Sequence, residues 1–241
     1  VELMYVIDLD NNTVEEYYNG AMFNSGPWDG DAHNTLQAID LYSAGASSVY
    51  YDDITIEKTL MPVGLWTFDE GDGDVALDSS GNMNDGTITD ATWVEGIDGG
   101  ALDMAGVGYV QVPAEAWMSV ENEMTVAFWA YGDPAVMPQS HTVFAAYSDA
   151  ENNEARIASA HIPWGNGNVY FDTGGTPTSG GYDRISAAAT TEEYAGQWRH
   201  WAFVKDAVSG DQQIYLDGVL WHSGTGLTRP MAGVTAFTIG A

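Results

Sequence analysis

A loop rich in oxygen ligands occupies residues 78–86, where the sequence reads DSSGNMNDG. Asp78, Asn82 and Asp85 offer carboxylate and amide oxygens, the ligands that Ca²⁺ prefers, and the two glycines let the chain bend around an ion. These residues predict a calcium site. The alternative is a solvated surface loop closed by Asx turns, for which the same residue types are typical.

A second pair of acids, Asp52 and Asp53, lies in the segment VYYDDITIE at residues 49–57. Neighbouring side chains of a strand point to opposite faces, so one of the two carboxylates would face the interior. A buried carboxylate is costly unless it binds a metal ion or accepts hydrogen bonds. We therefore predict a second calcium site at this pair, with hydrogen bonding as the alternative.

Aromatic and polar residues suited to sugars occur between residues 161 and 184. Sugar sites combine aromatic faces with a few amide, carboxylate or guanidinium groups in a mostly preformed arrangement. The predicted carbohydrate-binding residues are Trp164, Asn166, Tyr182, Asp183 and Arg184. For the arginine, the alternative is a salt bridge to the adjacent aspartate or to another acid. The tryptophans expected in the core, because they fall within predicted strands, are Trp66, Trp129, Trp198 and Trp201.

No set of residues in the sequence supports catalysis. Glycoside hydrolysis needs two carboxylates about 5–5.5 Å or about 6.5–9.5 Å apart. The nearest string is EGIDGG at residues 95–100, whose three glycines indicate a loop. Nucleophile-elbow and His-Glu-x-x-His motifs are absent, the five histidines are scattered, and there is no cysteine. We therefore predict that the protein is not an enzyme and has no catalytic residues.

The net charge restricts the partners. Against 6 Lys and Arg stand 35 Asp and Glu, for a formal charge of -29. Such a field repels phosphate backbones and anionic lipid heads, so nucleic-acid binding is excluded. No window approaches ~18 consecutive apolar residues, so membrane insertion is excluded as well. An acidic surface attracts cations, which agrees with calcium as a cofactor.

The elements that position these residues are predicted to be short β-strands. Apolar and polar residues alternate in runs separated by Gly, Asn and Asp, and Asn19-Gly20 and Asp217-Gly218 predict type I′ hairpin turns. The predicted strands are residues 3–9, 13–18, 36–42, 49–57, 63–68, 109–112, 124–131, 142–147, 155–160, 168–171, 198–204, 212–216 and 234–239. One helical turn is expected at residues 191–194, with Thr191 as its cap. This pattern predicts an all-β fold, an antiparallel β-sandwich or jelly roll.

One supersecondary unit occurs twice in the sequence. Residues 5–20 and 203–218 each read strand, polar turn, strand, and end in YYNG or YLDG. Repeats of this length indicate duplicated domains rather than a solenoid. The segment at residues 58–62 ends one predicted strand with a proline that blocks its continuation, so we place the domain boundary there.

Five segments together resemble the laminin-G-like, concanavalin A-like jelly roll of bacterial surface proteins. They read GLWTFDEGDGDVALDSSGNMNDGTI (64–88), GGALDMAGVGYVQVP (99–113), MTVAFWAY (124–131), WRHWAFVKD (198–206) and IYLDGVLWHSG (214–224). The resemblance covers roughly residues 61–241 and implies a sandwich of the lectin-glucanase type. It also implies a structural ion in the loop at residues 78–86.

The resemblance implies a domain organisation as well. Residues 1–58 look like the C-terminal part of a first jelly-roll domain, and residues 59–62 form a linker. Residues 63–241 look like a second, laminin-G-like jelly roll. This second domain is expected to lack its last strand, because no IDDV-type motif follows TAFTIG near its end.

These observations lead to two functional hypotheses. The first is a non-catalytic, extracellular or cell-surface module of a larger protein that binds carbohydrate or a glycoprotein, stabilised by calcium. The alternative is a structural subunit of a filament or surface layer, in which residues 1–58 of one copy complete the second domain of another by strand addition. Self-association by strand complementation is the partner that this alternative predicts.

The charge imbalance yields a first testable prediction. Acids of one sign repel one another, and salt at about 0.15 M shortens the range of that repulsion to about 8 Å. We therefore expect the melting temperature to rise from low to moderate NaCl at a fixed calcium concentration. A flat or falling trend would mean that bound cations already neutralise the acids.

Overall fold

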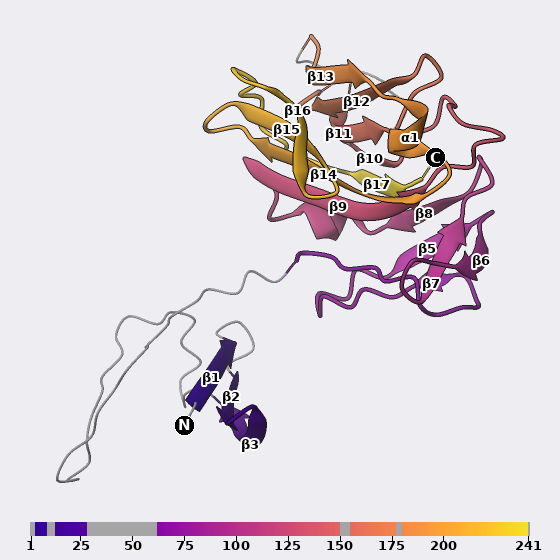
Figure 1. Cartoon of the computed structure of the whole chain (residues 1–241). Coiled ribbons are helices and arrows are strands. Elements are labelled where there is room, and N and C mark those ends of the chain that lie inside the picture. The colour runs from indigo at the N-terminus through magenta and orange to yellow at the C-terminus, as the bar shows by residue number, and fades with distance from the viewer. Residues whose placement is uncertain (1–2, 9–12, 28–61, 150–154, 177–179, 241) are drawn as a thin grey trace. The chain divides into compact units, whose positions relative to one another are not determined.

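The computed structural model describes residues 3–8, 13–27, 62–149, 155–176 and 180–240. The chain divides into two compact units, residues 1–58 and 59–241, each of which is taken by itself below (Figure 1). The strands predicted at residues 36–42 and 49–57 lie outside the described residues. The same holds for the predicted metal ligands Asp52 and Asp53.

The first unit contains a three-stranded antiparallel sheet. Its strands β1 (Leu3–Asp8), β2 (Thr13–Tyr18) and β3 (Ala21–Pro27) are paired in the order β1-β2-β3. Asn19 and Gly20, with φ angles of 48° and 79°, connect β2 to β3. A type I′ turn needs positive φ at both positions, so the predicted turn is confirmed. The strand β3 itself was not among the predicted strands.

The second unit contains an eight-stranded and a four-stranded antiparallel sheet (Figure 1). The larger sheet has the order β13-β12-β11-β10-β17-β8-β5-β4 and the smaller one the order β16-β15-β14-β9, while β6 and β7 form a separate hairpin. The elements are β4 (Val75–Ala76), β5 (Gly86–Thr89), β6 (Thr92–Glu95), β7 (Gly100–Asp103), β8 (Tyr109–Val112), η1 (Ala114–Trp117), β9 (Glu123–Tyr131), β10 (Phe144–Tyr147), β11 (Arg156–His161), β12 (Asn168–Thr173), β13 (Asp183–Ala188), α1 (Thr191–Tyr194), β14 (Trp198–Asp206), β15 (Asp211–Leu216), β16 (Val219–Gly224) and β17 (Ala236–Ile239). The predicted all-β antiparallel sandwich is confirmed. Within the described ranges, no helix is long and apolar enough to cross a membrane.

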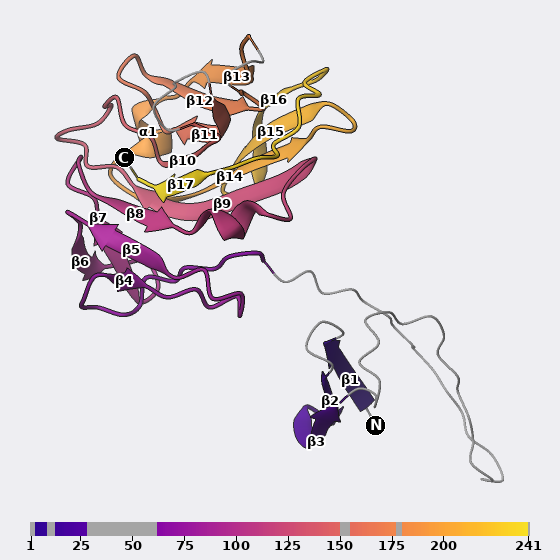
Figure 2. The ribbon, with the colours of Figure 1, turned by 180° about the vertical axis from the view of Figure 1, so that it is seen from behind.

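Aromatic side chains join the two sheets, which Figure 2 shows from behind as two layers. Phe144 of β10 and Phe171 of β12 each meet Phe203 of β14, with ring centroids 5.6 and 5.3 Å apart in edge-to-face geometry. All three side chains are buried. Each contributes about 1.5–3 kcal/mol through removal of its apolar surface from water. The core therefore lies between the sheets, and the alternate positions of each strand face away from it.

Strand alternation explains where the tryptophans lie. Trp201 of β14 is 1% exposed, as predicted for a core residue. Trp129 of β9 is 49% exposed, so its placement in the core was wrong. The reason is the period of the strand: Met124 is buried, and positions an odd number of residues away point to the opposite face.

Two local predictions also need correction. The strand predicted at residues 63–68 is reduced to a single bridge between Trp66 and Asp78. The helical turn α1 forms where predicted, but its cap is Thr190, whose backbone N–H donates to the Glu193 carboxylate at 2.7 Å. A Glu three residues after the cap completes a capping box, a signal that favours Thr190 over Thr191.

A buried ammonium group ties β14 to β13. Lys205 has a side chain with no solvent exposure, and its Nζ donates to Asp183 Oδ2 at 3.0 Å and to the Leu227 carbonyl oxygen. Burial lowers the pKa of Lys205, while the charge of Asp183 opposes that shift. An unpaired buried charge costs several kcal/mol, so moving Lys205 away from Asp183 is unfavourable. The ion pair therefore holds β14 and β13 close to each other.

The Lys205 contact can be tested by substitution. Lys205→Met removes the ammonium partner of Asp183, which keeps the Arg229 guanidinium at 3.4 Å. We therefore expect the free energy of unfolding to fall by about 3 kcal/mol in urea denaturation, the lower end of the cost of breaking a buried ion pair. Arg199→Met is the matched control, because Arg199 pairs with Asp217 at the surface. Its loss should be about 1 kcal/mol or less. Equal losses in the two variants would contradict this account.

Candidate functional site

The outer face of the eight-stranded sheet, turned away from the core, carries one of the predicted sugar-binding residues, Arg184, and three others contact it from loops. Strand pairing and alternation place a defined set of side chains on it. We call the following residues the outer face: Thr87, Thr89, Tyr109, Gln111, Ala145, Tyr147, Arg156, Ser159, His161, Asn168, Tyr170, Asp172, Arg184, Ser186, Ala188, Ala236 and Thr238. Trp164 and Tyr182 contact this face from the adjoining loops.

Asp172 is the charged centre of the outer face. Its carboxylate is fully buried and accepts hydrogen bonds from Arg156 Nη1 at 2.7 Å and from Arg184 Nε and Nη2 at 2.5 and 2.7 Å. Strand pairing sets Arg184 directly opposite Asp172. A buried carboxylate needs such charge-assisted bonds, and in return it holds both guanidinium groups in fixed positions.

The Arg184 guanidinium is stacked on two aromatic rings. Its carbon lies 4.7 Å from the centroid of Tyr170 and 4.9 Å from that of Tyr182. The hydrogen bond to Asp172 raises the pKa of Arg184, against the opposing effect of partial burial. The side chain is 37% exposed, so a cation held by Asp172 and by two rings remains accessible to solvent.

The hydroxyl of Tyr170 is surrounded by amide donors. Asn166 Nδ2 donates to it at 2.8 Å and Asn168 Nδ2 at 3.4 Å. These bonds lower the pKa of Tyr170. Because the oxygen accepts both of them, the hydroxyl hydrogen is directed to another acceptor, which a ligand can supply.

His161 and Trp164 form the adjoining aromatic pair. Their ring centroids are 4.6 Å apart in edge-to-face geometry. His161 Nδ1 lies 2.9 Å from the His141 carbonyl oxygen, and since a carbonyl only accepts, Nδ1 carries a hydrogen. Burial lowers the pKa of His161, so the ring is neutral at pH 7 and its Nε2 is an acceptor. Trp164 itself is 36% exposed.

The structure brings four of the five predicted sugar-binding residues together. Trp164, Asn166, Tyr182 and Arg184 contact outer-face residues. Asp183 does not join them: its Oδ2 accepts from Lys205 Nζ at 3.0 Å and from the Arg229 N–H at 2.9 Å. The predicted alternative for Arg184 was a salt bridge, which forms with Asp172 on the neighbouring strand rather than with Asp183.

Sequence reasoning missed Arg156, His161, Tyr170 and Asp172. The available signal was the period of β12, in which Asn168, Tyr170 and Asp172 are separated by the apolar Val169 and Phe171. That alternation assigns Tyr170 and Asp172 to one face. The pairing with Arg184 depends on the register of β12 against β13, which only the structure supplies.

The oxygen-rich loop at residues 78–86 binds its own backbone. Asp78 Oδ1 accepts from the N–H groups of Leu65 and Ser80, both at 2.9 Å, and Oδ2 accepts from Asn84 N–H at 3.0 Å. Partial burial would raise the pKa of Asp78, but these bonds and the Ser80 hydroxyl lower it on balance.

The other two predicted calcium ligands of the loop are also engaged. Asp85 Oδ1 accepts the Asp78 N–H at 2.8 Å, and Asn82 Nδ2 donates to Val63 O and Ser80 Oγ. In the part of the chain that the structure describes, no group of three or more His, Cys, Asp or Glu side chains is arranged to hold a metal ion. The bonding pattern agrees with the Asx-turn alternative, and calcium stays a prediction.

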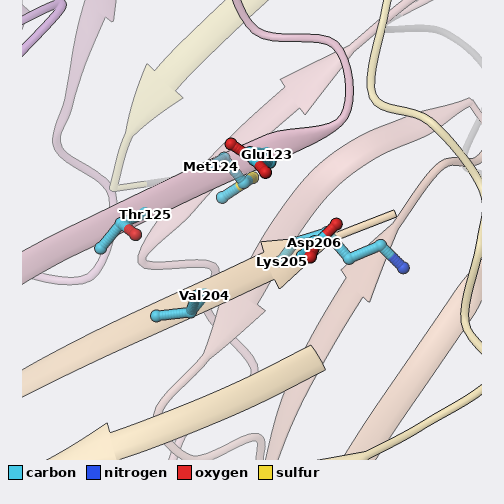
Figure 3. A pocket seen from close by; sticks show the side chains of 6 residues that line it. All are labelled: Glu123, Met124, Thr125, Val204, Lys205 and Asp206. Atoms are coloured by element: carbon cyan, nitrogen blue, oxygen red, sulfur yellow. The ribbon is translucent and has the colours of Figure 1, made fainter. Parts of the chain in front are cut away.

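A shallow hollow lies elsewhere, between β9 and β14 of the smaller sheet. Glu123, Met124 and Thr125 line it from β9, and Val204, Lys205 and Asp206 line it from β14 (Figure 3). The ammonium group of Lys205 is already bonded within the core. The hollow therefore shares no residue with the outer face and offers no aromatic side chain for stacking.

Comparison with known families gives one match. A family model described as the concanavalin A-like lectin/glucanases superfamily matches residues 104–241, more than half of the chain. A search of curated proteins gives no match.

Several solved structures resemble the chain at low sequence identity. Domain 4 of a GH43 extracellular arabinanase from Geobacillus stearothermophilus, in complex with arabinotriose, is 23% identical with a TM-score of 0.52, covering 73% of this chain and 82% of its own. The binding domains of botulinum neurotoxin serotypes G and D are 12% and 13% identical, each with a TM-score of 0.52. Each match covers 74% of this chain, which spans only 42% and 44% of those two domains. At such identities the likeness shows the fold alone.

The hydrogen bonds that Asp78 accepts from its own loop lead to a prediction for its substitution. Asp78→Ala leaves three backbone N–H groups without their acceptor, so we expect the free energy of unfolding to fall by about 1–3 kcal/mol in urea denaturation. The folded pKa lies below the ordinary value, so this stabilisation is full above about pH 4 and is lost as the pH falls through the folded pKa. Asp72→Ala, at an exposed acid of a neighbouring loop, is the control. Melting with and without chelator completes the test: a chelator-dependent loss would support calcium instead.

Proposed function

The chain belongs to the concanavalin A-like lectin/glucanase superfamily, and on that basis we propose that it is a non-catalytic, extracellular carbohydrate-binding module. The observation that supports this most directly is the outer-face assembly of Arg184, Tyr170 and Tyr182 beside Trp164. Aromatic rings for stacking and polar groups for hydroxyls are combined there in the way that sugar sites require.

The assembly is held in place before any ligand arrives. Asp172 binds both Arg156 and Arg184, and the guanidinium of Arg184 is stacked on tyrosine rings. Side chains that are already fixed lose little conformational entropy on binding. Such a face is therefore suited to ligands that contribute few contacts each, as sugars do.

The single acid among the outer-face residues supports binding without catalysis. Asp172 is the only acid among the outer-face residues, and both of its oxygens accept from guanidinium groups in a fully buried position. A glycosidase needs two carboxylates that reach the glycosidic bond. Asp172 alone, buried and ion-paired, offers neither a proton nor a nucleophile.

The names of the solved structures that resemble the chain are consistent with a binding function. One is a domain of an extracellular arabinanase solved with arabinotriose, and others are binding domains of botulinum neurotoxins. By analogy, we propose that this chain is extracellular and that its ligand is a carbohydrate or a glycoprotein.

A second candidate function is favoured by the edge of the smaller sheet. β9 is nine residues long, pairs with β14 without a bulge, and has no neighbour on its other side among the described strands. Long edge strands with unpaired backbone groups pair with strands of other chains unless they are protected. A structural subunit that shares strands between copies is therefore the alternative.

Binding to immobilised glycans tests the first proposal. We expect the full chain to retain at least one class of glycan, and Trp164→Ala to weaken that binding about tenfold through loss of a stacking surface. Trp129→Ala is the matched control, since that half-exposed tryptophan lies on β9 of the other sheet. An array without any retained glycan, together with assembly that grows with protein concentration, would favour the structural subunit.

A further inference from the structure

The outer face is nearly free of acids on a chain that has 35 of them. Its charged residues are Asp172, Arg156 and Arg184, so one positive charge is in excess over this set. The other outer-face residues are aliphatic, aromatic, hydroxyl or amide side chains and His161, which is neutral at pH 7. Among the outer-face residues, a ligand therefore meets an exposed guanidinium, while the carboxylate of Asp172 is buried.

Two neighbouring groups of the face, the Arg184 guanidinium and the Tyr170 hydroxyl, have hydrogens left to donate. Asp172 takes Nε and Nη2 of Arg184, and no described residue is bonded to Nη1. The Tyr170 hydroxyl oxygen accepts from two amides, which leaves its hydrogen to donate. Sugar hydroxyls both donate and accept, whereas a carboxylate only accepts. Donors without a matching exposed carboxylate therefore fit an anionic group better than a hydroxyl.

From this arrangement we propose that the outer face binds acidic saccharides, whose sugar carboxylate accepts hydrogen bonds from Arg184 Nη1 and the Tyr170 hydroxyl. The proposal rests on the carbohydrate-binding function above and narrows its ligand class. Arginine is suited to this role because its planar, permanently charged guanidinium makes directed, charge-assisted bonds to carboxylates. Stacking between Tyr170 and Tyr182 holds the plane of the guanidinium fixed.

The net charge of -29 does not prevent binding of an anion at this place. At about 0.15 M salt, charges more than about 8 Å apart are largely screened, so the nearest groups dominate the energy. Among the described residues, the charged groups nearest to this place are the guanidinium groups of Arg184 and Arg156 and the buried carboxylate of Asp172 between them. The distant acids slow the approach of an anionic ligand at low salt more than they weaken its final contacts.

Calorimetric titration of the full chain with two probes tests the proposal. The probes are an oligomer of galacturonic acid and the same oligomer fully methyl-esterified, which share a backbone and differ in charge. We expect the acid to bind about tenfold tighter or more than the ester in 0.15 M NaCl. Arg184→Gln should abolish that preference, and Arg199→Gln, a change in the Arg–Asp pair on the other sheet, should retain it. Arg184→Lys, which keeps the charge but loses the planar fork, should keep part of it.

The outcomes separate this proposal from the function on which it rests. Equal affinity for acid and ester, or retention of neutral glycans alone on the array, would overturn the acidic ligand class and leave carbohydrate binding intact. Absence of binding to every glycan would overturn both. The comparison of acid with ester uses the unaltered protein, so it decides the matter even where a variant at Arg184 fails to fold.

Discussion

The scarcity of cations is the constraint on which this structure depends. The sequence has 6 Lys and Arg, and the five within the described ranges all pair with aspartates. Arg156 and Arg184 pair with Asp172, Lys205 and Arg229 with Asp183, and Arg199 with Asp217. Two of these aspartates therefore take four cations. Most acids of the chain therefore have no cationic partner. At Asp172 and Asp183, by contrast, the ion pairs hold side chains of different segments in fixed positions.

The ion pairs of these two aspartates meet on one strand. Asp183 and Arg184 are consecutive residues of β13, so alternation sends the first toward the core and the second to the outer face. The core side of the strand is tied to β14 through Lys205, and the outer side is tied to β12 through Asp172. The position of the exposed guanidinium is thus coupled to the packing of the two sheets, which gives a surface group the rigidity of an interior one.

Much of the fold was predictable because its signals are local. Asn19-Gly20 and Asp217-Gly218 adopt the positive φ angles that their hairpins require, and the alternation of β15 was visible in the sequence. The site was only partly predictable, because it depends on register between strands. Nothing local distinguishes Asp183 from Asp172 as the partner of Arg184, since the choice follows from which strand lies alongside. Likewise, Trp129 carries no local sign that its side of β9 faces solvent.

The reactivity of the buried ammonium group of Lys205 can report on opening of the β-sandwich. Its lysines are Lys58 and Lys205, and the side chain of Lys205 is inaccessible to solvent. Amine-reactive reagents reach Lys205 only when the two sheets separate, so its rate of acylation measures how often the sandwich opens. Because that amine lies in the core rather than on the outer face, its acylation does not modify the guanidinium of Arg184 or the two tyrosines stacked on it.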